Sequence, residues 1–122
     1  MEKVKGIGGV FLRAKDPSVL TAWYRDVLGV TPAPSDMSTP PWLAEGGVTV
    51  FAPFAADTDY FPTEQQVMIN FRVDDLDAML AQLGGHNIAP FNESTMEGVG
   101  HFAHIRDPEG NAIELWEPVS SE

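Results

Sequence analysis

The clearest hydrophobic pattern in the chain alternates with a period of two near the C-terminal end, between His101 and Pro118. Ile113 and Leu115 share one face of an expected strand, and Glu114 lies on the other face. The sequence Asp-Pro-Glu-Gly-Asn at 107–111 has turn chemistry, because Pro presets φ and Gly or Asn tolerates positive φ. The pattern therefore predicts two strands joined by a tight turn, with a carboxylate placed as on a strand that lines a binding cleft.

Two other segments carry apolar residues at helical spacing, and each follows an alternating segment. Asp16 is placed to cap the first helix and Gly29 to end it. Asp75 is placed to cap the second, which ends at the glycine pair 84–85. The alternating segments at 6–15 and 67–73 precede these helices and are predicted to be strands.

The order of strand, helix and further strands occurs twice along the chain. Leu-Arg-Ala-Lys-Asp at 12–16 aligns with Phe-Arg-Val-Asp-Asp at 71–75, so that two arginines and two capping aspartates coincide. Further strands are expected at 42–51 and 86–91, and 92–100 is expected to be a polar loop. A duplication of this size suggests two modules packed about a pseudo-twofold axis.

The predicted fold class is α+β, with two βαβββ modules that form a cupped mixed sheet with helices outside. One domain spans 1–122, with the first module at 5–54, a connector at 55–65 and the second module at 66–118. The connector holds Asp57, Asp59 and Tyr60, which fit either a lid or a dimer contact.

If each helix covers one sheet face, the opposite face lines a concavity. That face is mixed polar and aromatic, as is typical of a small-molecule pocket. Glu114 and His104 are the candidate catalytic residues, because they lie on adjacent strands of one hairpin. The candidate ligand-binding residues are Phe11, Arg13, Trp42, Met68, Asn70, Arg72, Phe102 and Trp116.

The charge balance narrows the choice of partners. Eighteen acidic residues against seven basic ones give a formal net charge of −11, which argues against sequence-independent nucleic-acid binding. The excess of acids fits a cationic ligand or simply a well-hydrated surface. The chain has no cysteine, which excludes disulfides and thiolate catalysis. No apolar run approaches the roughly 20 residues of a membrane span, so we expect a cytoplasmic protein without membrane contact.

Four segments together resemble one known superfamily. They are Val-Phe-Leu-Arg-Ala-Lys-Asp at 10–16, Trp-Tyr-Arg-Asp-Val-Leu-Gly at 23–29, Ile-Asn-Phe-Arg-Val-Asp-Asp at 69–75 and Asp-Pro-Glu-Gly-Asn-Ala-Ile-Glu-Leu at 107–115. Over nearly the whole chain the sequence resembles the vicinal oxygen chelate superfamily, which includes glyoxalase I, extradiol dioxygenases, fosfomycin resistance enzymes and bleomycin resistance proteins. The resemblance implies a homodimer with the cleft at or near the interface. It also implies one divalent metal, bound by His, Gln or Glu at equivalent strand positions.

Only one of the ligand positions that the resemblance implies holds a metal-binding residue type in this sequence. Glu114 matches the closing Glu, but Gly9 and Met68 occupy two expected ligand positions, and Val50 or Thr49 occupies the remaining one. A thioether is a poor ligand for a hard or borderline divalent ion, and a catalytic metal usually needs about three protein ligands. We therefore predict no metal and no other cofactor. The alternative is a weak site rebuilt from Glu114 and His104 with Asn70 or His101.

Two classes of function remain open. The first is a metal-free binder of a small organic molecule, similar to the bleomycin resistance proteins, which take up a cationic planar drug. The second is an enzyme, either a metal-dependent lyase or dioxygenase with a rearranged site, or an isomerase using Glu114 as base and His104 as acid. Structural roles compete with both, namely an ion pair of Glu114 with Arg13 or Arg72, or a hydrogen bond from His104 to Glu114.

Overall fold

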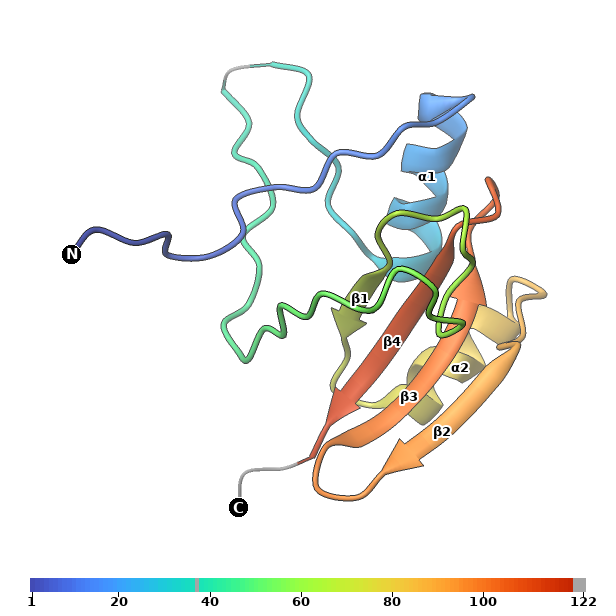
Figure 1. Ribbon diagram of the computed structural model, residues 1–122. Coiled ribbons are helices and arrows are strands. Elements are labelled where there is room, and N and C mark those ends of the chain that lie inside the picture. Colours follow the sequence, from blue (N-terminus) through green and yellow to red (C-terminus); the bar gives the residue numbers. More distant parts are fainter. Residues whose placement is uncertain (37, 120–122) are drawn as a thin grey trace.

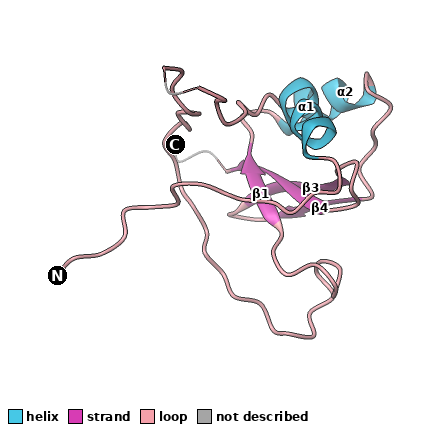
Figure 2. Cartoon of the chain, turned by 90° about the horizontal axis from the view of Figure 1, so that it is seen from above, coloured by secondary structure: helices cyan, strands magenta, loops and turns pink. Residues whose placement is uncertain are grey.

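The computed structural model describes residues 1–36 and 38–119 and contains one mixed sheet covered on one face by two helices (Figure 1). The strands are ordered β1-β4-β3-β2, with β1 parallel to β4 and the other neighbours antiparallel. Figure 2 shows both helices on the same side of the sheet. The α+β class is confirmed. The elements are α1 (Pro17–Leu28), β1 (Ile69–Arg72), α2 (Leu76–Gly84), β2 (Asn92–Met96), β3 (Gly100–Arg106) and β4 (Ala112–Pro118).

Both helices begin and end where local sequence signals placed their termini. The Asp16 carboxylate accepts a hydrogen bond from the Val19 N–H at 3.2 Å, which satisfies a free donor of the first turn of α1. Gly29 ends α1 in the left-handed conformation at φ 76°, which glycine adopts without steric cost. Asp75 caps α2 in the same way, through the Ala78 N–H at 3.0 Å.

The core lies between the helices and the sheet. Ile113 and Leu115 of β4 and Ile105 of β3 are at most 1 % exposed, and Leu83 of α2 is fully buried against the same cluster. The predicted alternation of β4 is confirmed, because these apolar residues face the helices while Glu114 lies on the other face.

The turn between β3 and β4 is organised by Asp107. One carboxylate oxygen accepts from the N–H groups of Glu109 at 2.9 Å and Asn111 at 3.0 Å, and Gly110 takes a positive φ of 86°. The other oxygen accepts the Tyr24 hydroxyl at 2.7 Å. Burial and this hydrogen bond raise the pKa of Tyr24 well above its usual range. The turn is thereby fixed to α1 as well as to its own strands.

Three expectations about strands are wrong. In the described part of residues 1–68, neither 6–15 nor 42–51 forms a strand, so only the second expected module supplies the sheet. An alternating segment needs a neighbour for its backbone groups, and this single chain offers these two none. Residues 86–91 form no strand either: 86 and 87 belong to a turn in which Asn87 has a φ of 61°, and the strand β2 lies at Asn92–Met96, where a loop was expected. β2 is exposed along its whole length and exists because it pairs with β3, not because of an apolar pattern.

The first half of the chain consequently leaves many apolar side chains exposed. The N-terminal segment runs away from the sheet in Figure 1. Phe11 is 99 % exposed and Leu43 is 89 % exposed, values that large apolar residues of a folded domain rarely reach together. Within the described ranges, no helix has both the length and the apolarity to cross a bilayer.

Candidate functional site

Strand register brings the polar candidates together on the sheet face opposite the helices. Asn70 of β1 is the partner of Glu114 on β4, and Glu114 is the partner of His104 on β3. Two residues further along, Arg72, Trp116 and Phe102 form a second row on the same face. The expected mixed lining of this face is therefore present for the residues of the second half of the chain.

Glu114 is a buried carboxylate at the centre of a hydrogen-bond cluster. Its side chain, on a residue only 6 % exposed, accepts from Asn70 Nδ2 at 2.7 Å and lies 2.8 Å from His104 Nε2. A third partner is the hydroxyl of Tyr60, which donates to the oxygen that faces His104. Because the carboxylate accepts three hydrogen bonds, its burial is compensated without an arginine or lysine.

Tyr60 reaches the site from the connector, where sequence reasoning left its role open. Its ring stacks on Phe54 with centroids 5.4 Å apart and meets the His104 ring edge-on at 5.2 Å. Burial, followed by the hydrogen bond to Glu114, raises the pKa of Tyr60 well above its usual range. The sequence signal was weak, namely an aromatic pair, Tyr60 and Phe61, in a segment without periodicity. Tyr60 covers Glu114, which gives the connector the position of a lid.

Residues 9–116 match the model of a family described as the glyoxalase-like domain. The chain belongs to this glyoxalase-like domain family. The match spans most of the chain, and it confirms the resemblance to the vicinal oxygen chelate superfamily. Among curated proteins, none matches the chain significantly.

Solved structures share the fold of this glyoxalase-like domain. TnmS3, an antibiotic binding protein from Streptomyces sp. CB03234, is 24% identical with a TM-score of 0.65, and the match covers 98% of this chain and 100% of that one. Lactoylglutathione lyase from Agrobacterium tumefaciens is 22% identical with a TM-score of 0.61, covering 94% and 95% of the two chains. A glyoxalase/bleomycin resistance protein from Streptomyces sp. CB03234 is 26% identical with a TM-score of 0.52, covering 84% and 92%.

The donor set of this glyoxalase-like domain does not fit a catalytic metal. Within residues 1–36 and 38–119, no three His, Cys, Asp or Glu side chains converge on one point. The facing atoms of Glu114 and His104 bind each other, and Gly9 and Met68 offer no hard ligand. His101 cannot join them, because it is three residues from His104 on the same strand and therefore lies on the opposite face of the sheet, where its Nδ1 is 2.9 Å from Thr95 Oγ1. That the protein works without a metal stays a prediction.

The two arginines of the internal repeat do not neutralise Glu114. Arg72 donates instead to the carbonyl oxygens of Val48 at 2.5 Å and Glu45 at 2.9 Å. Arg13 is exposed in the segment before α1. The alternative expectation, an ion pair of Glu114 with either arginine, is therefore wrong, whereas the expected hydrogen bond with His104 is present. Through these hydrogen bonds Arg72 links β1 to the segment that precedes the connector.

The aromatic candidates differ in their surroundings. Phe102 stacks parallel to Trp116 with centroids 6.0 Å apart, but Trp116 is only 7 % exposed and its indole N–H donates to the Val99 carbonyl oxygen. Phe11 and Trp42 are exposed in segments that form no strand. The structure therefore brings one aromatic pair to the site face and leaves the other two candidates outside it. Met68 is half-buried directly before β1.

Proposed function

We propose that the protein binds a small organic cation at Glu114, on the sheet face that the connector covers, and that it does so without a metal ion. The observation that carries this proposal is the buried carboxylate, whose partners are a phenol, an amide and an imidazole. Among the described residues, no arginine or lysine forms an ion pair with it. A buried anion compensated only by hydrogen bonds attracts a cation that can enter its site.

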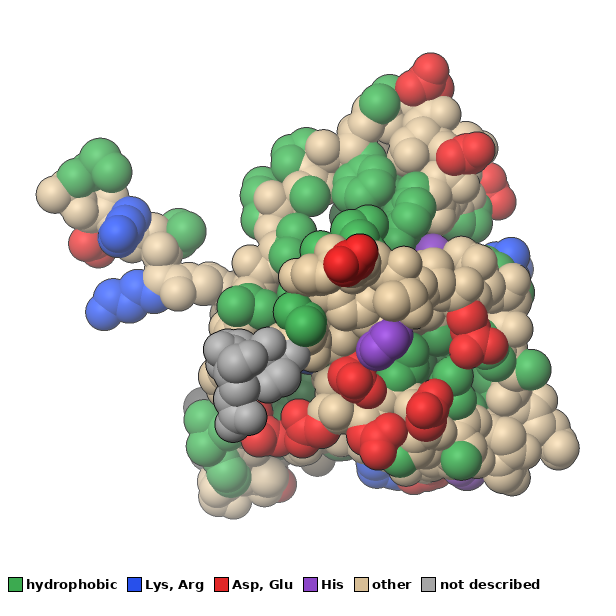
Figure 3. Space-filling view, turned by 90° about the horizontal axis from the view of Figure 1, so that it is seen from below, with side chains coloured by type: hydrophobic (Ala, Val, Ile, Leu, Met, Phe, Trp, Pro, Cys, Tyr) green, Lys and Arg blue, Asp and Glu red, His purple; other side chains and the backbone are tan. Residues whose placement is uncertain are grey.

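The surroundings of Glu114 support the same ligand class. The chain carries a net charge of −11, and Figure 3 shows several acidic side chains at the end of the molecule that lies lowest in Figure 1. A negative surface concentrates cationic ligands near their site. The Tyr60 and His104 rings and the Phe102–Trp116 pair provide aromatic surface beside the carboxylate, which suits a planar ligand. The related fold of TnmS3, an antibiotic binding protein, is compatible with small-molecule binding on this scaffold.

The test uses three ring compounds of nearly equal shape and different charge: benzamidine, benzamide and benzoate. Tryptophan fluorescence of the full chain should respond to benzamidine, and Glu114→Gln should weaken that response by about tenfold or more, because a charge-assisted hydrogen bond becomes a neutral one. Glu93→Gln is the matched control, since Glu93 is an exposed carboxylate on β2. Equal affinity of wild type and Glu114→Gln for benzamidine would overturn the proposal.

The metal-free part of the proposal has its own measurement. The protein, purified without a His tag, should contain no stoichiometric metal, and Zn²⁺, Ni²⁺, Mn²⁺ or Fe²⁺ should leave its melting temperature unchanged. Tight binding of any of these ions to the folded state would raise that temperature and refute metal independence.

The isomerase alternative stays a prediction of the sequence. In the structure Oε2 of Glu114 already has two partners, Tyr60 and His104, whereas Oε1 accepts only from Asn70, so a substrate proton would have to approach Oε1.

We further propose that the protein is a homodimer, in which the exposed apolar segments of the first half pair with a second copy. The alternating residues Val48 and Val50 are more than half exposed, as are Val10 and Phe11. Covering them would remove a large apolar area from water at about 25 cal/mol per Å². Sedimentation velocity should show a dimer, and Val10→Asp should shift it toward monomer. A wild-type monomer at micromolar concentration would contradict this arrangement.

A further inference from the structure

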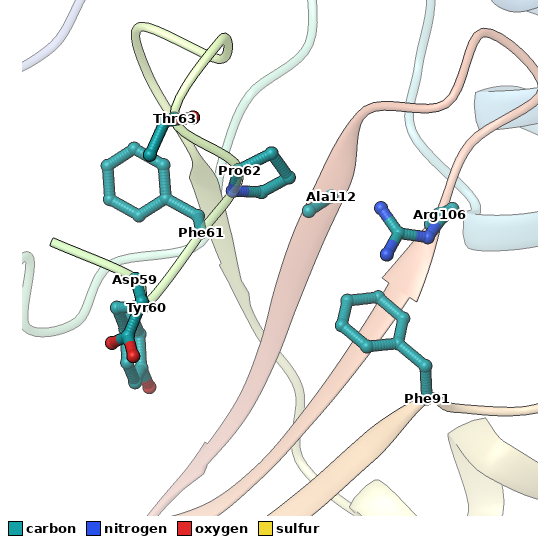
Figure 4. Close-up of a pocket in the computed structure, with 8 residues that line it drawn as sticks. All are labelled: Asp59, Tyr60, Phe61, Pro62, Thr63, Phe91, Arg106 and Ala112. Carbon is teal, nitrogen blue, oxygen red and sulfur yellow. The ribbon is translucent and has the colours of Figure 1, made fainter. Parts of the chain in front are cut away.

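A cleft of about 300 Å³ lies between the connector and the turn end of the β3–β4 hairpin. We call it the connector cleft. Figure 4 shows Phe61 and Pro62 on one side, Arg106 and Phe91 on the other, and Ala112 between them. The volume is at the lower end of the roughly 300–1,000 Å³ of small-molecule sites. Its remaining lining residues are Asp59, Tyr60 and Thr63.

Arg106 gives this cleft a fixed positive charge. The carbon of its guanidinium lies 4.3 Å from the centre of the Phe91 ring, a cation–π contact that places the group over the ring. Within residues 1–36 and 38–119, no carboxylate forms an ion pair with Arg106, whereas Arg25 pairs with Asp26 at 2.8 Å. A guanidinium has five N–H donors and stays charged at any physiological pH. Stacking on a ring uses its face and leaves the donors on its edge for a ligand.

We infer that the connector cleft binds a small planar aromatic carboxylate. The aromatic ring of the ligand fits between Phe91 and the Phe61–Pro62 side, and the carboxylate meets the Arg106 guanidinium in a two-pronged hydrogen bond. Asp59 lines the connector side of the cleft and repels an anion there, which orients the ligand with its carboxylate toward Arg106. This site is separate from the proposed cation site at Glu114, although Tyr60 lines the one and covers the other.

An NMR titration of the full chain with benzoate, benzamide and benzamidine tests the inference. Benzoate should shift the Arg106 Nε–Hε signal and the Ala112 amide signal. Benzamide should bind at least about tenfold more weakly, because it has the same ring but no charge to pair with the guanidinium. Arg106→Gln should weaken benzoate binding by a similar factor. Arg106→Lys should weaken it less, since it keeps the charge and loses the planar fork.

Two control variants and one further variant of the cleft keep the result specific. Arg25→Gln removes an exposed arginine far along the chain and should leave benzoate binding unchanged. Phe91→Leu keeps Arg106 but removes the ring on which it stacks, and it should also weaken benzoate binding. The inference is overturned if benzoate and benzamide bind equally, or if Arg106→Gln binds benzoate like wild type. Glu114→Gln should retain benzoate binding, so that failure of the cation site and failure of the connector cleft give different results.

Discussion

The hydroxyl of Tyr60 joins the connector to Glu114, and Tyr60→Phe removes that hydroxyl while keeping the ring against Phe54 and His104. A hydrogen bond to a charged group contributes about 1.5–3 kcal/mol. Tyr60 is 40% exposed, so we discount this for solvent to about 1 kcal/mol. With an unfolding entropy near 0.26 kcal/mol/K for 122 residues, the melting temperature should fall by about 4 °C.

The same substitution should strengthen binding of a cation. We expect the cation to take the place of the Tyr60 hydroxyl at Glu114 in the wild type, and the free energy of the hydrogen bond that is broken is then subtracted from the binding free energy. Without the hydroxyl, the affinity for benzamidine should rise by up to about fivefold, the equivalent of about 1 kcal/mol. Calorimetric melting and tryptophan fluorescence titration of the same samples measure the two effects.

The opposite signs of these effects are what the lid interpretation requires. If affinity falls together with stability, Tyr60 contacts the ligand rather than covering its site. If the melting temperature does not change, the Tyr60–Glu114 bond does not form in solution. Tyr24→Phe is the matched control, because its hydroxyl binds Asp107 at 2.7 Å in the buried turn contact. It should lower stability and leave benzamidine affinity unchanged.

Three further predictions concern stability. Because the pKa of Tyr60 is raised in the fold, the protonated hydroxyl stabilises the fold fully below the ordinary tyrosine pKa of about 10, and this contribution is lost as the pH rises above it. The stability difference between wild type and Tyr60→Phe, measured by urea unfolding, should therefore shrink at alkaline pH. Hydrogen bonds from the Val19 N–H and the Ser18 hydroxyl lower the pKa of Asp16, so its contribution to the stability of the fold is present above about pH 4 and is lost on acidification. Asp16→Asn should therefore make the free energy of unfolding fall less steeply with decreasing pH below that value. Leu83→Ala empties a fully buried position and should cost about 2–5 kcal/mol in urea unfolding, whereas an unchanged midpoint would contradict the core assignment.

The parts of the fold that could be predicted from sequence are those whose causes are local. Asp16 and Gly29 bound α1 because capping and left-handed φ are properties of single residues. The turn at Asp107 forms from hydrogen bonds to residues two and four positions away. The strand β2 could not be predicted in this way, because its residues are polar and exposed and only pairing with β3 makes them a strand.

The candidate site divides along the same line. Glu114 and His104 were predictable because alternation in one hairpin places both on one face. Tyr60 was not, because it meets Glu114 from 54 residues away and belongs to a segment without periodicity. The aligned arginines of the repeat were a misleading signal, since Arg72 binds backbone carbonyl oxygens and Arg13 is exposed. The alternation of residues in a strand indicates which sheet face a side chain lies on. Which residues of a distant loop contact that side chain depends on the course of the whole chain in the folded structure.

The chemistry around Glu114 favours an organic cation over a bare metal ion. Metal ligation needs lone pairs directed at the ion, but the groups around this carboxylate are the Asn70 amide, the Tyr60 hydroxyl and the His104 imidazole, and the amide and the hydroxyl direct hydrogens at Glu114. A metal at Glu114 would meet those hydrogens and would require the donors to turn away. An ammonium or amidinium N–H instead replaces the single Tyr60 O–H donor and leaves Asn70 and His104 in place. It also brings a positive charge to a carboxylate that no arginine or lysine neutralises among the described residues. Benzamidine should therefore compete with the Tyr60 hydroxyl and leave the amide signal of Asn70 unshifted, whereas a metal ion that bound at Glu114 would move both.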